Sequence, residues 1–206
     1  MNILCFGDSN TYGYIPGGLG RYNTEQRYTG ILQNILGYRF RVAEDGVCGR
    51  TAVFEKDSPG KRGIDCIGMA VKQNKPDILV VMLGTNDCKA KFNADAEKIT
   101  DGMVQLINTA KFIRPQLKVI LCAPVFIGYE ALGCSNDYSE KSLLVSRRLP
   151  DSYRRIAMQN GYSFLDANMA ADADPKDGEH MNEESHTRFA KILAEMVIKL
   201  LSDYNR

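Results

Sequence analysis

The chain has 206 residues, of which 44% are hydrophobic and 25% are charged, as in an ordinary globular protein. Its 26 basic and 25 acidic residues leave a net charge of +1, which excludes both the basic surface of a nucleic-acid-binding protein and the acidic tail of a disordered one. A chain of about 200 residues buries roughly 70% of the surface that it exposes when unfolded, so the length predicts a single domain over residues 1–206.

The amino-terminal sequence and the cysteines bear on where the protein works. The first apolar run begins at Asn2 and turns at Gly7, which is too short for a secretory signal, and no apolar run approaches the ~20 residues of a membrane span. None of the six cysteines stands in a C-x-x-C pair, the spacing of zinc ribbons and thioredoxin-type sites. We therefore expect a cytoplasmic protein with reduced cysteines and no membrane partner.

Five short apolar runs predict strands at residues 3–6, 40–43, 78–83, 119–123 and 163–165. Between them, apolar residues at helical spacing predict helices over residues 25–36, 66–75, 94–113, 139–160 and 182–201. We expect Gly37 to end the first helix and Pro150 to interrupt the fourth. The run at 78–83 is apolar without alternation, which suits a strand covered on both faces. The alternation of strands and helices predicts a three-layer α/β/α sandwich with a five-stranded parallel sheet.

The segments after these strands carry reactive side chains. In an open parallel sheet, ligands bind at the carboxyl ends of the strands, so these segments are expected to share one edge. They are Gly7-Asp8-Ser9-Asn10, the turn containing Gly49, Gly84-Thr85-Asn86-Asp87, and a polar loop ending at Asp177-Gly178-Glu179-His180.

Ser9 and His180 are a candidate nucleophile and base. A serine becomes a useful nucleophile when a base takes its proton, and a carboxylate usually orients that base. Asp177 stands three residues before His180, where a turn brings the two together. The backbone N–H groups of Ser9 and Gly49 and the side-chain amide of Asn86 are candidate donors to the oxyanion that forms on an attacked carbonyl.

In this order, the four segments resemble the four sequence blocks of the SGNH (GDSL-like) hydrolase superfamily, over essentially the whole chain. Residues 3–14 and 81–90 are similar to the arylesterase and acyltransferase/perhydrolase branch. The resemblance implies a flavodoxin-like fold with Ser9 as nucleophile, His180 as base, Asp177 as its partner, and an oxyanion hole formed by Ser9, Gly49 and Asn86. Two residues depart from the family pattern, because Asn10 replaces the leucine of the GDSL group and Met181 replaces a proline that often follows the histidine.

Each candidate residue also has a structural interpretation. Ser9 is a common type of helix cap, Asn86 a common turn residue, and Gly49 a residue that permits tight turns. The second histidine, His186, falls on the apolar stripe of the last helix and is expected to be a packing residue. Cys48 and Cys88 adjoin the candidate site, but neither has a base placed by the sequence.

The function expected from these residues is a serine esterase that hydrolyses small carboxylic esters, with short acyl groups, through an acyl-Ser9 intermediate and without a metal or another cofactor. Acyl transfer to another alcohol or a peroxide is a further expectation, as is a homo-oligomer, which relatives in this branch often form. A lysophospholipase or thioesterase and an inert binding module of the same fold are the alternatives. An α/β-hydrolase and a P-loop protein are disfavoured, since neither G-x-S-x-G nor G-x-x-x-x-G-K-[ST] occurs.

Overall fold

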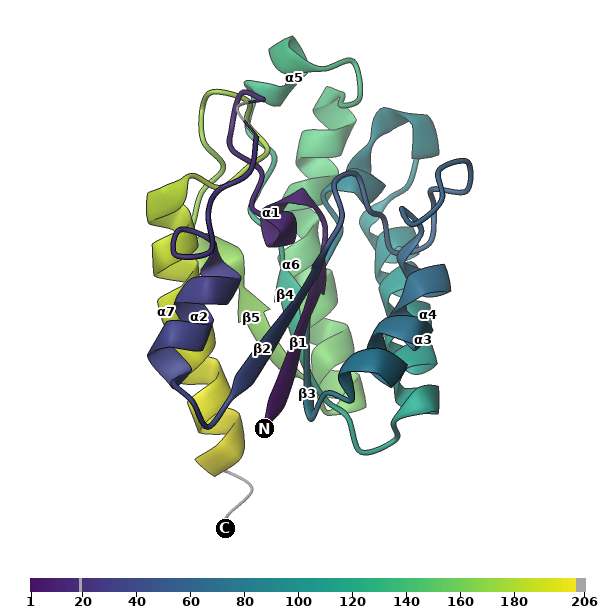
Figure 1. The fold of residues 1–206 in the computed structure, drawn as a ribbon. Helices are drawn as coiled ribbons and strands as arrows, with labels where there is room; N and C mark the ends of the chain where they lie inside the picture. The colour runs from purple at the N-terminus through teal and green to yellow at the C-terminus, as the bar shows by residue number, and fades with distance from the viewer. Residues whose placement is uncertain (19, 203–206) are drawn as a thin grey trace.

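A computed structural model of the protein describes residues 1–18 and 20–202. Its centre is a five-stranded sheet in the order β2-β1-β3-β4-β5 (Figure 1). The strands are β1 (Asn2–Gly7), β2 (Arg41–Gly46), β3 (Ile78–Met82), β4 (Lys118–Ala123) and β5 (Ser163–Asp166). All neighbouring pairs are parallel, which confirms the predicted sheet.

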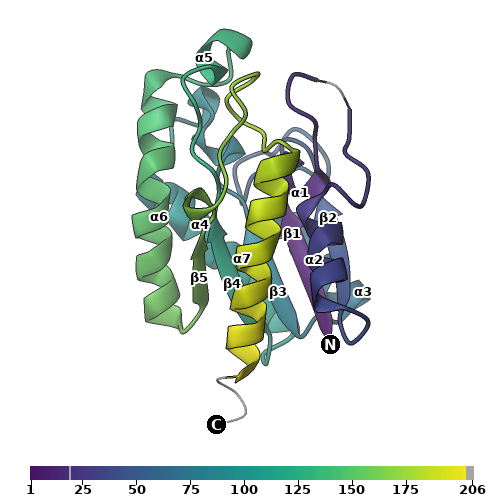
Figure 2. The ribbon, with the colours of Figure 1, turned by 90° about the vertical axis from the view of Figure 1, so that its left-hand side faces the viewer.

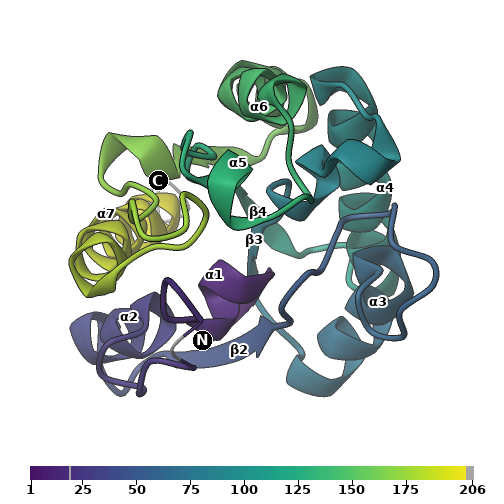
Figure 3. The same cartoon turned by 90° about the horizontal axis from the view of Figure 1, so that it is seen from above.

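Helices cover both faces of this sheet, and Figure 3 shows the three layers from above. One face packs against α2 (Tyr28–Leu36) and α7 (Glu183–Ser202), and the other against α3 (Gly63–Asn74), α4 (Ala96–Ile113) and α6 (Glu140–Asn160). Successive side chains of β1 point to opposite faces of the sheet. Ile3 and Cys5 pack on the side of α2 and α7, and Leu4 and Phe6 pack on the side of α3, α4 and α6. The three-layer α/β/α prediction is therefore confirmed.

Several predicted elements differ from the structure. The helix predicted from residue 25 begins at Tyr28, and the helix predicted from residue 66 begins at Gly63. The second strand runs on to Gly46 because its charged residues are paired: Glu44 bonds Arg27 at 3.0 Å, and Asp45 bonds Arg50 at 2.8 Å. The predicted interruption at Pro150 is wrong, since α6 continues through it. Proline removes one helical N–H, but Leu149, Pro150 and Tyr153 are all buried, and we attribute the unbroken helix to this packing.

Short helices and long loops lie above the carboxyl ends of the strands (Figure 2). They include α1 (Ser9–Tyr12), the 3₁₀ turn η1 (Asn86–Cys88) and α5 (Ala131–Cys134). Gly46, at the end of β2, lets α1 approach closely, because a Cβ atom there would lie 2.2 Å from the backbone nitrogen of Tyr12. The fold thus gathers the chemically interesting segments at one edge. Within residues 1–18 and 20–202, no helix has both the length and the apolar character needed to cross a bilayer.

Candidate active site

Ser9 lies at the point where β1 turns into α1. Asp8 caps this helix, because its Oδ1 accepts the backbone N–H of Asn10 at 3.0 Å. Ser9 is therefore the first helical residue and not the cap that the structural interpretation proposed. Its side chain is free for another partner, and the residue is only 4% exposed.

The structure brings Ser9, His180 and Asp177 into one chain of hydrogen bonds. His180 Nε2 lies 2.9 Å from Ser9 Oγ, and His180 Nδ1 lies 2.9 Å from Asp177 Oδ2. His180 itself is 8% exposed and sits in the loop just before α7. Ser9 Oγ is thus hydrogen-bonded to a base that is oriented in turn by a carboxylate, as nucleophilic activation requires.

Asp177 is held as a carboxylate by its neighbours. Burial opposes its ionisation, but His180 and the backbone N–H groups of Gly17, Glu179 and His180 all donate to it at 2.9–3.0 Å. These bonds outweigh the burial and keep the pKa of Asp177 well below its ordinary value. For His180, burial lowers the pKa, but the bond to Asp177 and the charge of Glu179 outweigh it, so that its pKa is raised.

The three candidate oxyanion donors follow neighbouring strands. Gly7 of β1 pairs in register with Gly46 of β2 and Met82 of β3, so the segments after these strands start from the same row of the sheet. Gly49 has a φ of 79°, in the left-handed region that favours glycine. Among the described residues, the backbone N–H groups of Ser9 and Gly49 have no acceptor. Both are therefore available to a ligand.

Asn86 is buried, and Asp8 orients its side-chain amide. Asn86 Nδ2 donates one of its two hydrogens to Asp8 Oδ2 at 3.4 Å. The other Nδ2 hydrogen takes no part in this bond. Burial raises the pKa of Asp8 to about 6 and that of Asp87 to about 7. Asp8 thus connects the segment after β1 to the segment after β3.

The alternative nucleophiles lack a base. Burial, followed by the charge of Asp8, raises the pKa of the Cys48 thiol, and burial raises that of Cys88. Both are therefore protonated at neutral pH, whereas a cysteine nucleophile acts as the thiolate. The second histidine, His186, is fully buried in α7, as expected for a packing residue.

Sequence reasoning did not assign roles to three residues around His180. The side-chain amide of Asn10 spans the histidine: its Nδ2 donates to the backbone oxygen of Glu179 at 3.2 Å, and its Oδ1 accepts the N–H of Met181 at 2.8 Å. The hydroxyl of Tyr138 donates to Glu179 Oε1 at 2.6 Å. Only the departure of Asn10 and Met181 from the family pattern signalled any of this.

In the described part of the chain, no group of three or more His, Cys, Asp or Glu side chains is placed to hold a metal ion.

Comparisons with known proteins bear on the family and the fold of the chain. The sequence model of the GDSL-like lipase/acylhydrolase family matches residues 5–188. An acetylxylan esterase of Xylanibacter ruminicola is 27% identical over 221 residues, covering 94% of this chain and 42% of that protein. The chain therefore spans less than half the length of this curated relative.

Two solved structures resemble the protein over nearly their whole length. Est24, a carbohydrate acetylesterase from Sinorhizobium meliloti, matches with a TM-score of 0.90 at 28% identity, covering 97% of this chain and 99% of its own. The native aryl esterase of M. smegmatis matches with a TM-score of 0.89 at 29% identity, with the same two coverages of 97% and 99%.

Proposed function

The chain belongs to the GDSL-like lipase/acylhydrolase family, and from this membership we propose that it is a serine esterase that cleaves short-acyl carboxylic esters through an acyl-Ser9 intermediate. The observation that carries the proposal is the chain of 2.9 Å contacts from Ser9 Oγ to His180 and from His180 to Asp177. The acetylxylan esterase and carbohydrate acetylesterase among its relatives favour acetyl esters of carbohydrates as the substrate class.

In the acylation step, Ser9 Oγ bonds to the ester carbonyl carbon while its proton passes to His180 Nε2. The carbonyl oxygen becomes an oxyanion, which accepts hydrogen bonds from the N–H groups of Ser9 and Gly49 and from Asn86. Asp177 Oδ2 accepts a hydrogen bond from the Nδ1–H of His180 and stabilises the imidazolium. The bond to the alcohol oxygen then breaks, that oxygen takes the proton from Nε2, and acyl-Ser9 remains.

In the deacylation step, a water molecule attacks acyl-Ser9 and gives a proton to His180. The bond to Ser9 Oγ breaks, and Oγ recovers a proton from Nε2 while the acid leaves. If another alcohol replaces the water, the products are a new ester and free enzyme. Adding methanol to the assay and looking for methyl acetate tests this acyltransferase branch. The cytoplasmic location and the homo-oligomer expected from the sequence stay predictions.

Ser9→Ala tests the mechanism. We expect it to lower kcat for p-nitrophenyl acetate by about 10⁴-fold or more, because the covalent step loses its nucleophile. A serine-reactive phosphonate should add one adduct to the wild-type protein at Ser9, located by peptide mass spectrometry.

His180→Gln and His186→Gln form a matched pair for the base. Only His180→Gln should cause a comparable loss of kcat, because His186 Nδ1 accepts the N–H of Tyr28 and it is His180 that contacts Ser9 Oγ. Full turnover by Ser9→Ala, or a phosphonate adduct on Cys48, would contradict the proposal.

A further inference from the structure

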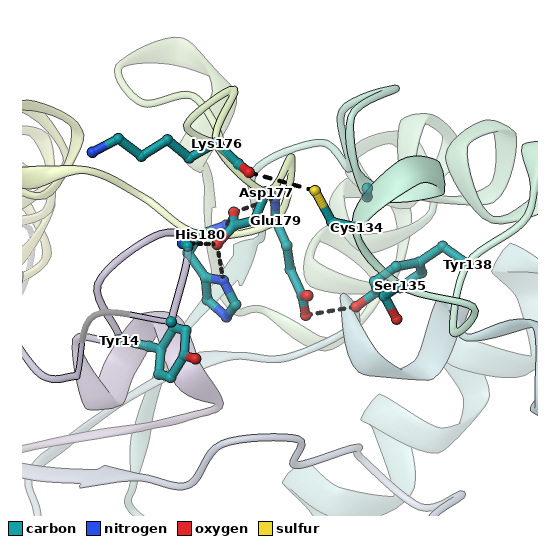
Figure 4. A pocket seen from close by; sticks show the side chains of 11 residues that line it. Tyr14, Cys134, Ser135, Tyr138, Lys176, Asp177, Glu179 and His180 are labelled. Carbon is teal, nitrogen blue, oxygen red and sulfur yellow. Dashed lines mark hydrogen bonds and ion pairs between the residues drawn. The ribbon is translucent and has the colours of Figure 1, made fainter.

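A cavity of about 400 Å³ opens beside His180 (Figure 4). Residues of the loop after α1, of the segment around α5, and of the loop before α7 line it. Ser9, Gly49 and Asn86 are not among its lining residues in the described part of the chain. The cavity therefore lies on the side of the base and not on the side of the oxyanion donors. In the proposed mechanism His180 protonates the departing alcohol oxygen, so the cavity is placed to receive the alcohol part of the ester.

Glu179 places a carboxylate in the wall of this cavity. The phenol of Tyr138 donates to its Oε1 at 2.6 Å, and among the described residues no donor contacts Oε2. Tyr138 is only 6% exposed, and burial, followed by the charge of Glu179, raises its pKa well above the ordinary value. Tyr138 therefore remains a donor to Oε1, and Oε2 is the carboxylate oxygen of Glu179 that is left for a ligand in the cavity.

The remaining charged groups of the wall do not neutralise Glu179. Asp177 is itself an acid, and its carboxylate is already engaged by His180 and three backbone amides. Lys176 also lines the cavity, but Figure 4 shows its amino group pointing away from Glu179. On the other side of His180, the Tyr14 ring lies 4.6 Å from the imidazole, centroid to centroid. The alcohol part thus meets the Tyr14 ring and the Glu179 carboxylate, which only accepts hydrogen bonds.

We propose that Glu179 selects the alcohol part of the ester: its Oε2 accepts a hydrogen bond from a free hydroxyl of a carbohydrate, and its charge disfavours alcohols that carry a carboxylate. This inference rests on the proposed esterase function and names the residue that favours a sugar over an aryl leaving group. A phenol leaving group has no second hydroxyl to donate, so it gains nothing from Glu179.

The substitution Glu179→Gln tests the proposal sharply. Because the hydroxyl of Tyr138 still donates, the amide oxygen of the glutamine faces Tyr138 and its NH₂ group takes the place of Oε2. An acceptor in the cavity thereby becomes a donor, with little change in shape. Glu130→Gln is the matched control, because Glu130 is an exposed acid beside α5 that does not line the cavity.

The measurement is the ratio of kcat/KM for a monoacetylated methyl xyloside to kcat/KM for p-nitrophenyl acetate. We expect Glu179→Gln to lower this ratio about tenfold, as for the loss of one hydrogen bond to a charged group, while Glu130→Gln leaves it unchanged. For a monoacetylated methyl glucuronide, kcat/KM relative to the xyloside should rise in Glu179→Gln, and this gain should shrink at high salt.

A second measurement separates selection from an indirect effect on the base. Asp177, Glu179 and Asp8 all face His180 and raise its pKa, so Glu179→Gln should move the acidic limb of the pH profile to lower pH for every substrate. The ratio is therefore compared on the plateau above this limb. An unchanged ratio on the plateau, with the variant folded, overturns the proposal. If the wild-type protein hydrolyses neither ester, the esterase proposal itself fails, and this inference fails with it.

Discussion

At the scale of single residues, the two departures from the family pattern contact each other. Asn10 Oδ1 accepts the backbone N–H of Met181 at 2.8 Å. A leucine at position 10 has no acceptor and a proline at position 181 has no N–H, so this bond exists only because both positions differ. Together with the bond from Asn10 Nδ2 to the Glu179 carbonyl, it fixes the backbone on both sides of His180.

This contact predicts a positioning role for Asn10. Asn10→Ala should lower kcat by about 10- to 100-fold, because a displaced catalytic group costs rate even when binding is retained, and KM should change far less. Steady-state kinetics with p-nitrophenyl acetate measures both constants. Asn160→Ala is the control, since Asn160 makes its side-chain bond to Ile156 at the far end of α6. A rise in KM with an unchanged kcat would contradict this role.

The sequence was sufficient to predict which residues meet at the site, but not how their neighbours hold them. Ser9, Asp177 and His180 could be placed together because their blocks follow predicted strands, and parallel strands end at one edge. The contact between Tyr138 and Glu179 joins residues 41 positions apart. Both residues belong to loops, whose conformation cannot be predicted from the spacing of apolar residues. Side-chain contacts between loops therefore needed the structure.

At the scale of elements, the spacing of apolar residues predicted the strands and helices. The predictions failed where paired charges or buried packing outweighed the local sequence signal. Glu44 and Asp45 at the end of β2 are polar, as loop residues usually are. The sequence does not show that each of them pairs with an arginine. Pro150 has the usual signature of a helix break, yet the buried face of α6 continues past it. Both errors arose where tertiary contacts outweighed a local preference.

The close approach of α1 to β2 can be tested at Gly46. Gly46→Ala should lower the free energy of unfolding by about 1–3 kcal/mol, as overpacking does, and should also reduce esterase activity because α1 begins with Ser9. The control is Gly133→Ala in α5, where an added Cβ has no atom within 4 Å, and where we expect a change within about 1 kcal/mol. Urea unfolding and p-nitrophenyl acetate hydrolysis measure the two effects. Equal stability of the two variants would contradict the packing argument.

At the scale of the whole molecule, the pH dependence of stability is expected to rest on His186, a histidine outside the candidate site. His186 lies between α7 and α2, where its Nδ1 accepts the N–H of Tyr28 at 3.4 Å, and its Nε2 has no partner among the described residues. Burial, then the charge of Arg27, lowers its pKa from 6.5 to about 3. The folded state therefore favours the neutral ring.

This shift predicts how stability depends on pH. The unfolded chain binds a proton at His186 below pH 6.5 and the folded protein does so only near pH 3, so the stabilisation is complete above pH 6.5 and is lost as the pH falls toward 3. Between pH 7 and pH 5, this residue should cost about 2 kcal/mol of unfolding free energy. In His186→Gln, that part of the acid sensitivity should disappear, as measured by urea unfolding at the two pH values. The same pH dependence in both proteins would contradict the buried-histidine account.

The separation of Ser9 and His180 along the chain has a consequence for the proposed mechanism while the protein is being synthesised. Ser9 and His180 are 171 residues apart, and the sheet brings them together only after β5 and the loop beyond it have joined. In a ribosome-bound chain, Ser9 is therefore synthesised long before His180 can contact it. In the proposed mechanism, the nascent chain cannot hydrolyse an ester until that loop has left the ribosome and docked, so activity begins only when folding is nearly complete.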